Sequence, residues 1–246
     1  MKKVILSLLT ILLFSGLANA QTNPPEKKMA DLTSRPADHL ILQSGVDFWV
    51  GVGGPDSVKT SGTGRHFNIY FMMDKPFKSN NKFSLAYGIG FGTNNQYIDK
   101  GTYVDLAQEG NTIRFRQLGS SANRFDKQKV ATMYVQVPAE IRYYSNPAKP
   151  NSSWKFAAGV KVGLLFKGYT KSKDYQTFNG TSLYGKTYVQ KISNKRFFSS
   201  NDITLTARAG YGIISMHAGY SVTPVLRDGY APSFNRLSVG LSISGL

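Results

Sequence analysis

The chain has 246 residues, contains no Cys, and carries 30 Lys and Arg against 14 Asp and Glu, a formal net charge of +16. The absence of cysteine excludes disulfide frameworks, thiolate metal sites and cysteine nucleophiles. Only 18% of the residues are charged, whereas 13% are aromatic and 24 are Gly, which disfavours a helical bundle or a disordered chain and favours many strands and turns.

The N-terminal segment 1–20 has the pattern of a secretory signal peptide. Lys2 and Lys3 precede an apolar run at 4–14, and Ala18-Asn19-Ala20 forms a small-x-small cleavage pattern. The alternative, an N-terminal membrane anchor, fails because the run is shorter than the roughly 20 residues that a spanning helix needs. We therefore predict an exported protein.

Cleavage would leave a mature chain that starts at Gln21. Residues 21–38 are rich in Pro, Lys, Asp and Thr and are predicted to form a flexible leader on the periplasmic side. No later segment reaches about 18 consecutive apolar residues, so we predict no transmembrane helix in the mature chain.

Alternation with a period of two begins at Leu40 and predicts strands. In 83–92 every odd position is large and every even position is small, and 154–166 alternates with the opposite parity. The odd positions of this second segment include Lys155, Lys161 and Lys167. Elsewhere the second face is mainly Gly, Ser and Ala, which fits the narrow interior of a transmembrane barrel better than the solvated face of a secreted β-sandwich, the alternative fold.

We predict an all-β fold, an eight-stranded antiparallel up-and-down transmembrane β-barrel over residues 39–246. Long connections at 94–129 and 169–200 fall on one side of the strands and short turns on the other, as in barrels with long outer loops and short periplasmic turns. The even strand number places both termini on the periplasmic side. The predicted strands cover residues 39–53, 65–76, 82–93, 130–144, 154–168, 201–212, 215–224 and 235–246.

Three segments carry motifs of a known family. The most specific is Tyr134-Val135-Gln136-Val137-Pro138-Ala139-Glu140-Ile141-Arg142-Tyr143-Tyr144, a Tyr-x-x-x-Pro strand that ends in a basic residue and paired tyrosines. The others are the Gly-alternating segment 158–165 and the closing segment 236–243. Together they resemble the PorT-like outer-membrane β-barrel family of the Bacteroidota, whose members combine a signal peptide with an OmpX/OmpA-like eight-stranded barrel.

The resemblance implies this barrel and an accessory role, since some relatives assist secretion across the outer membrane. The chain departs from such barrels at its C-terminus, which reads Ser244-Gly245-Leu246 where an aromatic residue is usual. Pro138 cannot donate a hydrogen bond to a strand ladder, so we expect a β-bulge at that position.

Ionic side chains on the parity that avoids lipid are expected inside the barrel. An Arg or Lys facing lipid at mid-depth would cost about 2 to 4 kcal/mol. The network could form a proton or ion path, or it could fill the interior with salt bridges, which we favour because side chains just fill an eight-stranded barrel. The candidate lumen ion network consists of Asp47, Glu140, Arg142, Lys161 and Arg208.

The histidines His39, His66 and His217 are far apart in the sequence, lack the spacing of a metal site and have no obvious catalytic partner. Some eight-stranded barrels are lipid A-modifying enzymes with a Ser and a His at the rim, and His66 is the one candidate for such a role. We predict no catalytic, cofactor-binding or metal-binding residues, and therefore no enzyme.

The loop 169–200 interleaves basic and aromatic residues. Such a pattern can bind nucleic acid, but the predicted export makes anionic lipopolysaccharide headgroups the expected counter-charge. A loop whose charge only aids solubility is the alternative. The candidate headgroup-binding residues are Lys171, Lys173, Lys186, Lys191, Lys195 and Arg196.

These patterns predict a monomeric protein of the cell outer membrane with a structural, adhesion or accessory role, secretion included, exerted through long extracellular loops. A small transport barrel and a lipid A-modifying enzyme are the alternatives. The expected partners are outer-membrane lipid, lipopolysaccharide and other envelope proteins, with no cofactor and no nucleic acid.

Overall fold

The predicted signal peptide and leader lie outside the part of the chain whose structure is described, and so does Leu246. The computed structural model describes residues 39–51, 60–106, 114–227 and 233–245.

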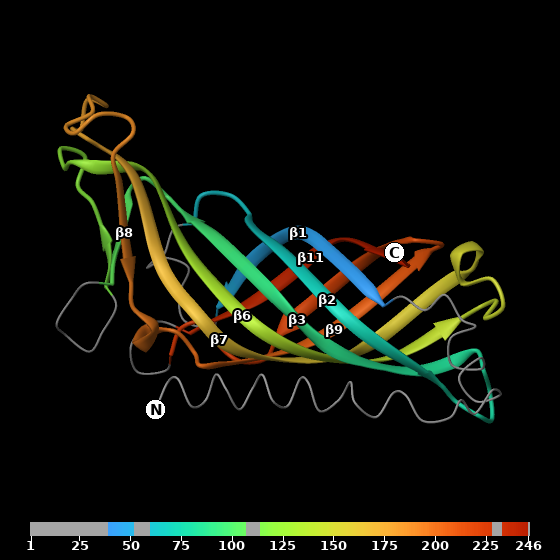
Figure 1. The fold of residues 1–246 in the computed structure, drawn as a ribbon. Helices are drawn as coiled ribbons and strands as arrows, with labels where there is room; N and C mark the ends of the chain where they lie inside the picture. The colour runs from blue at the N-terminus through green and yellow to red at the C-terminus, as the bar shows by residue number, and fades with distance from the viewer. Residues whose placement is uncertain (1–38, 52–59, 107–113, 228–232, 246) are drawn as a thin grey trace, which may run out of the picture. The chain divides into compact units, whose positions relative to one another are not determined.

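Within these residues, eight long antiparallel strands close into a barrel (Figure 1). Each strand pairs with its neighbours along the chain, and the first strand pairs with the last, with Leu42 opposite Ile243. The closed ring confirms the predicted eight-stranded up-and-down barrel and contradicts the β-sandwich. In chain order the strands are β1 (Leu40–Gly51), β2 (Gly64–Pro76), β3 (Phe83–Ile98), β6 (Arg124–Tyr144), β7 (Trp154–Gln176), β9 (Asn201–Tyr211), β10 (Ile214–Ser221) and β11 (Phe234–Ser244).

Short connections join the strands at one end of the barrel. Residues 77–82 link β2 to β3, and 145–153, with the 3-10 turn η1 (Pro150–Ser152), link β6 to β7. Between β9 and β10 the chain reverses within two residues, and Gly212 there has a φ of 64°, a conformation that glycine adopts without steric cost. Longer connections lie at the opposite end, as predicted.

The strands present an apolar outer face and a polar inner face, because successive side chains of a strand point to opposite sides. Along β3, for example, Leu85 and Ile89 are exposed, whereas Ser84 and Ala86 are fully buried. We call the exposed apolar surface around the barrel the apolar belt; its members include Phe71, Met73, Leu85, Ile89, Phe91, Val137, Ile141, Val162, Leu164, Leu205, Met216 and Leu241.

A pair of glycines brings β1 and β11 unusually close to two interior histidines. Gly45 and Gly240 lie directly opposite each other. A Cβ atom on Gly45 would lie 2.8 Å from the ring of His66, and one on Gly240 would lie 2.9 Å from the ring of His217. Any larger residue would therefore collide with the histidines that these glycines accommodate.

The strands β6 and β7 continue beyond the ring on the long-loop side, and β3 stays paired with β6 as far as Ile98. A register shift between Met133 and Tyr134 of β6, where Phe166 of β7 is left without a partner, marks the start of this extension. Beyond it, β6 and β7 remain paired as far as Arg124 and Gln176, and β8 (Val189–Ser193) adds to the edge of β7 (Figure 1). We call this three-stranded region the outer sheet.

The outer sheet corrects the prediction that 94–129 and 169–200 are loops, although 107–113 lies outside the described residues. The remaining elements of these segments are the hairpin of β4 (Thr102–Asp105) and β5 (Arg114–Gln117) and the 3-10 turn η2 (Lys195–Phe197). The bulge also reverses the parity of β7, so Lys167 lies opposite Met133 on the outer face and does not share a face with Lys155 and Lys161.

The bulge expected at Pro138 is absent. Pairing between β3 and β6 keeps one register from Phe83↔Tyr143 to Ile98↔Gln128, and only the pairs nearest Pro138 are missing from the ladder. Proline therefore removes a hydrogen-bond donor here without adding a residue to the strand, and on the other side Pro138 stays in register opposite Lys161.

An apolar cluster lies across the outer end of the barrel interior. It joins the inward-facing ends of β3, β6 and β11 to residues of the outer connections, and all its members are at most 9% exposed. The cluster consists of Ile98, Val104, Leu106, Val130, Phe197, Phe198, Leu226 and Phe234. None of the helices in the described part of the chain is long or apolar enough to cross a membrane.

Candidate functional site in the barrel interior and the outer sheet

Glu140 is the centre of an ion cluster inside the barrel. Its Oε2 atom accepts hydrogen bonds from Arg142 Nε at 3.1 Å and Arg208 Nη2 at 3.2 Å. Arg142 also lies 3.8 Å from Asp74 Oδ1, which accepts a hydrogen bond from the hydroxyl of Ser84. The structure thus brings together three of the predicted lumen residues, and it adds Asp74, which the sequence analysis missed because this residue stands at the end of the alternating run in β2.

Asp47, a fourth predicted residue, belongs to a separate hydrogen-bonded chain. Its Oδ1 atom lies 2.8 Å from Nδ1 of His66 and accepts a bond from Ser238 Oγ at 2.6 Å. His66 Nε2 lies 2.8 Å from His217 Nε2, and Nδ1 of His217 lies 3.0 Å from Ser242 Oγ. One tautomer assignment satisfies every contact: the hydroxyl donates to His217, His217 to His66, and His66 to the carboxylate.

This chain corrects the expectation that the histidines are separate. His66 and His217, 151 residues apart, meet in the interior and are 3% and 7% exposed. Their position inside the barrel removes the basis for placing His66 at a rim beside serines. His39 alone stays apart, with Nδ1 3.0 Å from the backbone carbonyl of Met72. The sequence signal for this meeting of the histidines was glycine. Gly45 lies opposite His66, and Gly240 lies opposite His217.

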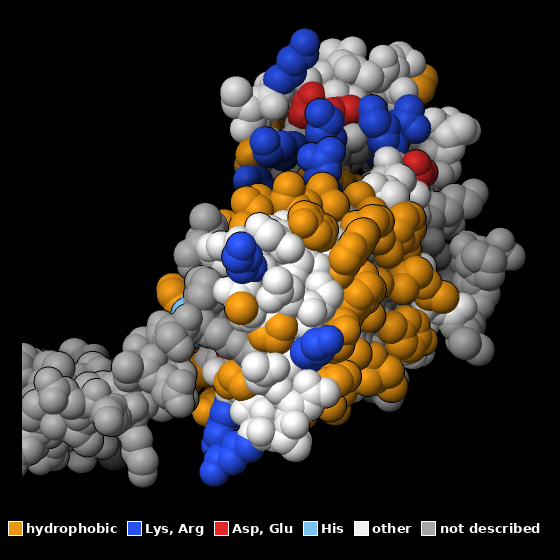
Figure 2. Space-filling view, turned by 90° about the vertical axis from the view of Figure 1, so that its right-hand side faces the viewer, with side chains coloured by type: hydrophobic (Ala, Val, Ile, Leu, Met, Phe, Trp, Pro, Cys, Tyr) orange, Lys and Arg blue, Asp and Glu red, His pale blue; other side chains and the backbone are white. Residues whose placement is uncertain are grey.

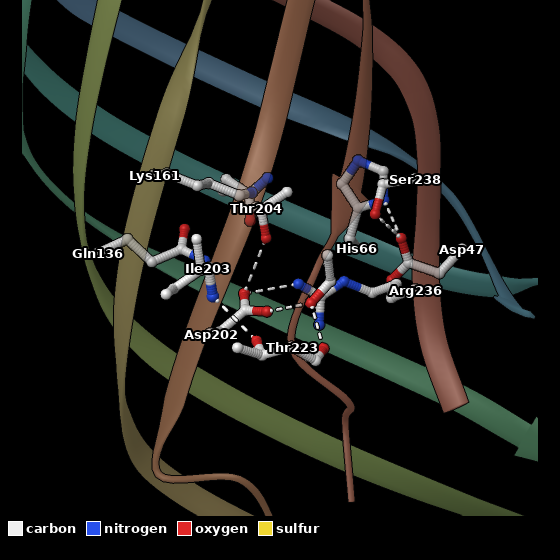
Figure 3. A network of polar contacts seen from close by, with 12 residues as sticks. Asp47, His66, Gln136, Lys161, Asp202, Ile203, Thr204, Thr223, Arg236 and Ser238 are labelled. Carbon is white, nitrogen blue, oxygen red and sulfur yellow. Dashed lines mark hydrogen bonds and ion pairs between the residues drawn. The ribbon is translucent and has the colours of Figure 1, made fainter. Parts of the chain in front are cut away.

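A third group surrounds Asp202. Arg236 Nη2 donates to Asp202 Oδ2 at 2.7 Å, and the hydroxyls of Ser221 and Thr204 donate to the same carboxylate. Figure 3 shows Arg236 lying between Asp202 and Asp47 in the barrel interior. Neither Asp202 nor Arg236 was singled out from the sequence, because the register that brings β9 and β11 together cannot be read from alternation.

Lys161, the fifth predicted residue, makes no ion pair in the described interior but joins a hydrogen-bonded row. Its ammonium group donates to the hydroxyl of Tyr70 at 3.3 Å, and that hydroxyl donates to Gln136 Oε1 at 2.6 Å. All five predicted lumen residues therefore face the interior, and three of them meet.

The described interior leaves little free space. One cavity beside Arg142 and Arg208 and another beside Asp47 and Arg236 each measure about 10 Å³. A volume of this size holds about one water molecule. With the apolar cluster across its outer end, the barrel interior is a packed core of paired charges.

The outer sheet has the opposite arrangement, because its lysines face one another. Lys129 of β6 lies directly opposite Lys171 of β7, which in turn lies opposite Lys191 of β8. Lys127 and Lys173 form the next row. Residues opposite each other in antiparallel strands lie on one face, so these five side chains share a surface, which we call the lysine face.

The lysine face has no carboxylate partner among the described residues. Lys129 donates to Asn95 Oδ1 at 2.7 Å, and the ammonium group of Lys191 lies 4.4 Å from the centre of the Tyr169 ring. Burial, together with the charges of the neighbouring lysines on β7 and β8, lowers the pKa of Lys129. Cross-strand like charges are destabilising, so these lysines weaken the pairing of the strands that carry them.

Three of the predicted headgroup residues, Lys171, Lys173 and Lys191, lie on the lysine face. Lys195 and Arg196 lie in η2, where they approach the rings of Phe166 at 5.7 Å and Phe197 at 4.5 Å. Lys186 lies in the connection before β8. The sequence analysis missed Lys127 and Lys129, because it placed them in a loop that is part of β6.

The family of the chain follows from its sequence and fold together. Residues 41–227 match the family described as outer membrane protein beta-barrel domain. The chain belongs to this family. The match covers all but the last strand of the ring, and it assigns the apolar belt to the lipid of an outer membrane.

The comparison with solved structures finds Ail, the attachment invasion locus protein of Yersinia pestis, crystallised in complex with the heparin analogue sucrose octasulfate. The sequences are 10% identical, the TM-score is 0.34, and the match covers 83% of this chain and 95% of Ail. No curated protein matches the chain.

The family sets the depth of the lysine face relative to the membrane. A tilted strand crosses a bilayer in about 9 to 11 residues, a length that β7 covers between Trp154 and Leu164. Figure 1 shows β8 at the end of the barrel opposite the short turns, and Figure 2 shows several Lys and Arg side chains at the edge of the hydrophobic surface. The lysine face therefore begins where the apolar belt ends.

Proposed function

We propose that this outer-membrane barrel does not conduct and instead presents its outer sheet and loops at the cell surface, in a structural, adhesion or accessory role without enzymatic activity. The observation that carries the proposal is the contrast in charge pairing. Arginines pair with Glu140 and Asp202 inside the barrel and Asp47 accepts hydrogen bonds there, whereas the lysine face has no counter-charge among the described residues.

We further propose that the lysine face binds the phosphates of lipopolysaccharide headgroups around a monomeric barrel. Its side chains project outward just beyond the apolar belt, at the height of the headgroups. Each Lys near an anionic membrane surface contributes about 1 kcal/mol of attraction. Phosphate between the rows would also remove the repulsion among Lys129, Lys171 and Lys191.

We also propose that the chain belongs to the narrower PorT-like family and has an accessory role in secretion. Its support is the segment 134–144, which forms the membrane-spanning part of β6 and carries Glu140 and Arg142 into the ion cluster. A signal peptide at 1–20 is part of the same proposal.

Single-channel recording tests the closed interior. We expect no conductance steps from the purified protein in planar bilayers, because the interior is filled and its outer end is covered by apolar side chains. Regular conductance steps would contradict the proposal and favour the transport barrel. A change in the mass of lipid A when the protein is expressed would favour the enzyme.

Lipopolysaccharide binding tests the lysine face. The triple variant Lys129→Gln, Lys171→Gln, Lys191→Gln should bind lipid A in detergent about 100-fold more weakly than the wild type, since three contributions of about 1 kcal/mol are lost. The matched control replaces Lys75, Lys78 and Lys82, which are exposed at the opposite end of the barrel, by Gln. Equal losses in both triple variants would show that net charge alone attracts lipid A.

A further inference from the structure

A second candidate site lies in the outer region, in a cavity of about 540 Å³. This volume falls within the range of about 300 to 1,000 Å³ that is typical of small-molecule sites. Its lining includes the aromatic rings of Tyr103, Phe125, Tyr175, Tyr184 and Tyr188. We call it the aromatic pocket.

The five rings form a connected series. Tyr103 stacks on Phe125 with ring centres 6.1 Å apart, and Phe125 contacts Tyr175 at 4.9 Å. Tyr184 then stacks on Tyr175 at 6.2 Å with only 13° between the ring planes, and its ring centre lies 5.1 Å from that of Tyr188. Tyr184 is nevertheless 67% exposed, so the series offers a large aromatic surface to solvent.

Polar groups border these rings, and the charge of the pocket is low. Asn123, Gln190 and Arg124 contribute to the lining, and Arg124 is its only cation among the described residues. The guanidinium of Arg124 donates to the backbone carbonyl of Phe178 at 3.2 Å. Gln190 is the neighbour of Lys191, and Phe125 and Tyr175 form the pair beyond Lys127 and Lys173, so the pocket adjoins the lysine face, but none of the described lysines lines it. The ligand chemistry of the two sites is therefore different.

We propose that the aromatic pocket binds a neutral oligosaccharide. The C–H groups on one side of a pyranose ring are apolar and carry a slight positive charge, which suits the negative face of an aromatic ring. The hydroxyl groups at the sugar's edge can exchange hydrogen bonds with the side-chain amides of Asn123 and Gln190 and with tyrosine hydroxyls. A purely apolar ligand would leave these polar groups unpaired, and an anionic ligand would find its cations on the lysine face.

The test uses the folded barrel in lauryldimethylamine oxide, because detergents with sugar headgroups would compete for the pocket. The protein is applied to an array of neutral malto-, cello-, xylo- and manno-oligosaccharides. We expect binding to at least one of them, measured afterwards by calorimetry.

Substitution of Tyr184 makes the test specific. Tyr184→Ala should weaken binding of the array ligand about tenfold, because an aromatic contact of this size contributes on the order of that factor. Tyr184→Phe should retain binding to within about threefold, since the ring is kept. Phe178→Ala is the matched control, because Phe178 is an exposed aromatic residue of the same connection that does not line the pocket.

Three outcomes would overturn the proposal: no binding to any neutral oligosaccharide, equal losses in Tyr184→Ala and Phe178→Ala, or binding to a proline-rich peptide but to no sugar. Heat-modifiable migration on a gel verifies that each variant is folded. The lysine variants should leave sugar binding unchanged, so failure of this inference and failure of lipopolysaccharide binding are distinguishable.

Discussion

The strands β6 and β7 belong to both the barrel interior and the outer sheet, but the arrangement of charges differs between the two regions. Inside the barrel, Glu140 contacts two arginines and Asp202 contacts a third. In the outer sheet, β6 and β7 place Lys129 and Lys171 side by side. The bulge after Leu164 separates the two regimes along one strand, where it also reverses which parity faces outward.

The difference in charge pairing reflects the surroundings of the two regions. Charges inside the barrel are shielded from water, so the carboxylates there take arginines or hydrogen-bond donors of the protein as partners, and Lys161 donates to a tyrosine hydroxyl. Lysines beyond the apolar belt can find their partners in the surrounding membrane surface, so the protein can leave their repulsion unbalanced. The interior thus supplies partners for its own carboxylates, whereas the proposed lipopolysaccharide phosphates would supply those of the lysine face.

The largest effect is expected from breaking a pair inside the barrel. Glu140→Gln leaves Arg208 without its carboxylate and should lower the free energy of unfolding by about 3 to 5 kcal/mol, measured by urea denaturation with tryptophan fluorescence. Adding Arg208→Met to this variant should recover part of the loss, because Arg142 retains Asp74 at 3.8 Å. Losses that simply add in the double variant would argue against a buried pair.

Much of the barrel could be predicted from the sequence, because alternation reports which face of a strand is apolar. All eight ring strands were located within a few residues, apart from the extensions of β3, β6 and β7. The strand β8 escaped because its two apolar residues, Val189 and Ile192, stand three positions apart and give no alternation with a period of two.

The contacts of the interior could be predicted only in part. Parity places Glu140 and Arg208 inside, but which ionic groups meet depends on how far neighbouring strands are shifted around the ring. Arg236 and Asp202 come from strands separated by β10, and His66 and His217 from opposite halves of the chain. These pairings are long-range, and local patterns contain no information about them.

A charge placed on the apolar belt should have the next largest effect. Ile89→Arg, near the middle of the membrane-spanning part of β3 and 55% exposed, should lower the free energy of unfolding in lipid vesicles by about 2 to 4 kcal/mol. Leu183→Arg introduces the same charge at an exposed site of the connection before β8 and should have little effect. Similar losses in both variants would place the membrane boundary beyond β8.

A smaller effect, of opposite sign in two environments, is expected at the centre of the lysine face. In detergent without lipopolysaccharide, Lys171→Gln should raise the free energy of unfolding by about 0.2 to 1 kcal/mol, because it removes repulsion from Lys129 and Lys191. In membranes that contain lipopolysaccharide, the same substitution should lower the free energy of unfolding by about 1 kcal/mol. The same sign in both environments would mean that no anion binds there.

The pH dependence of stability should show the smallest effect, and its sign follows from Lys129. Burial and the neighbouring lysines lower the pKa of this residue in the folded protein below its ordinary value of 10.5. At neutral pH the ammonium is charged in both states, and the full repulsion destabilises the fold. As the pH rises towards about 10, the folded state releases this proton before the unfolded state does, so stability increases.

Urea midpoints in detergent from about pH 8 to about pH 10 should therefore rise more in the wild type than in Lys129→Gln. Lipopolysaccharide should abolish the difference, because phosphate close to the ammonium favours its charged form.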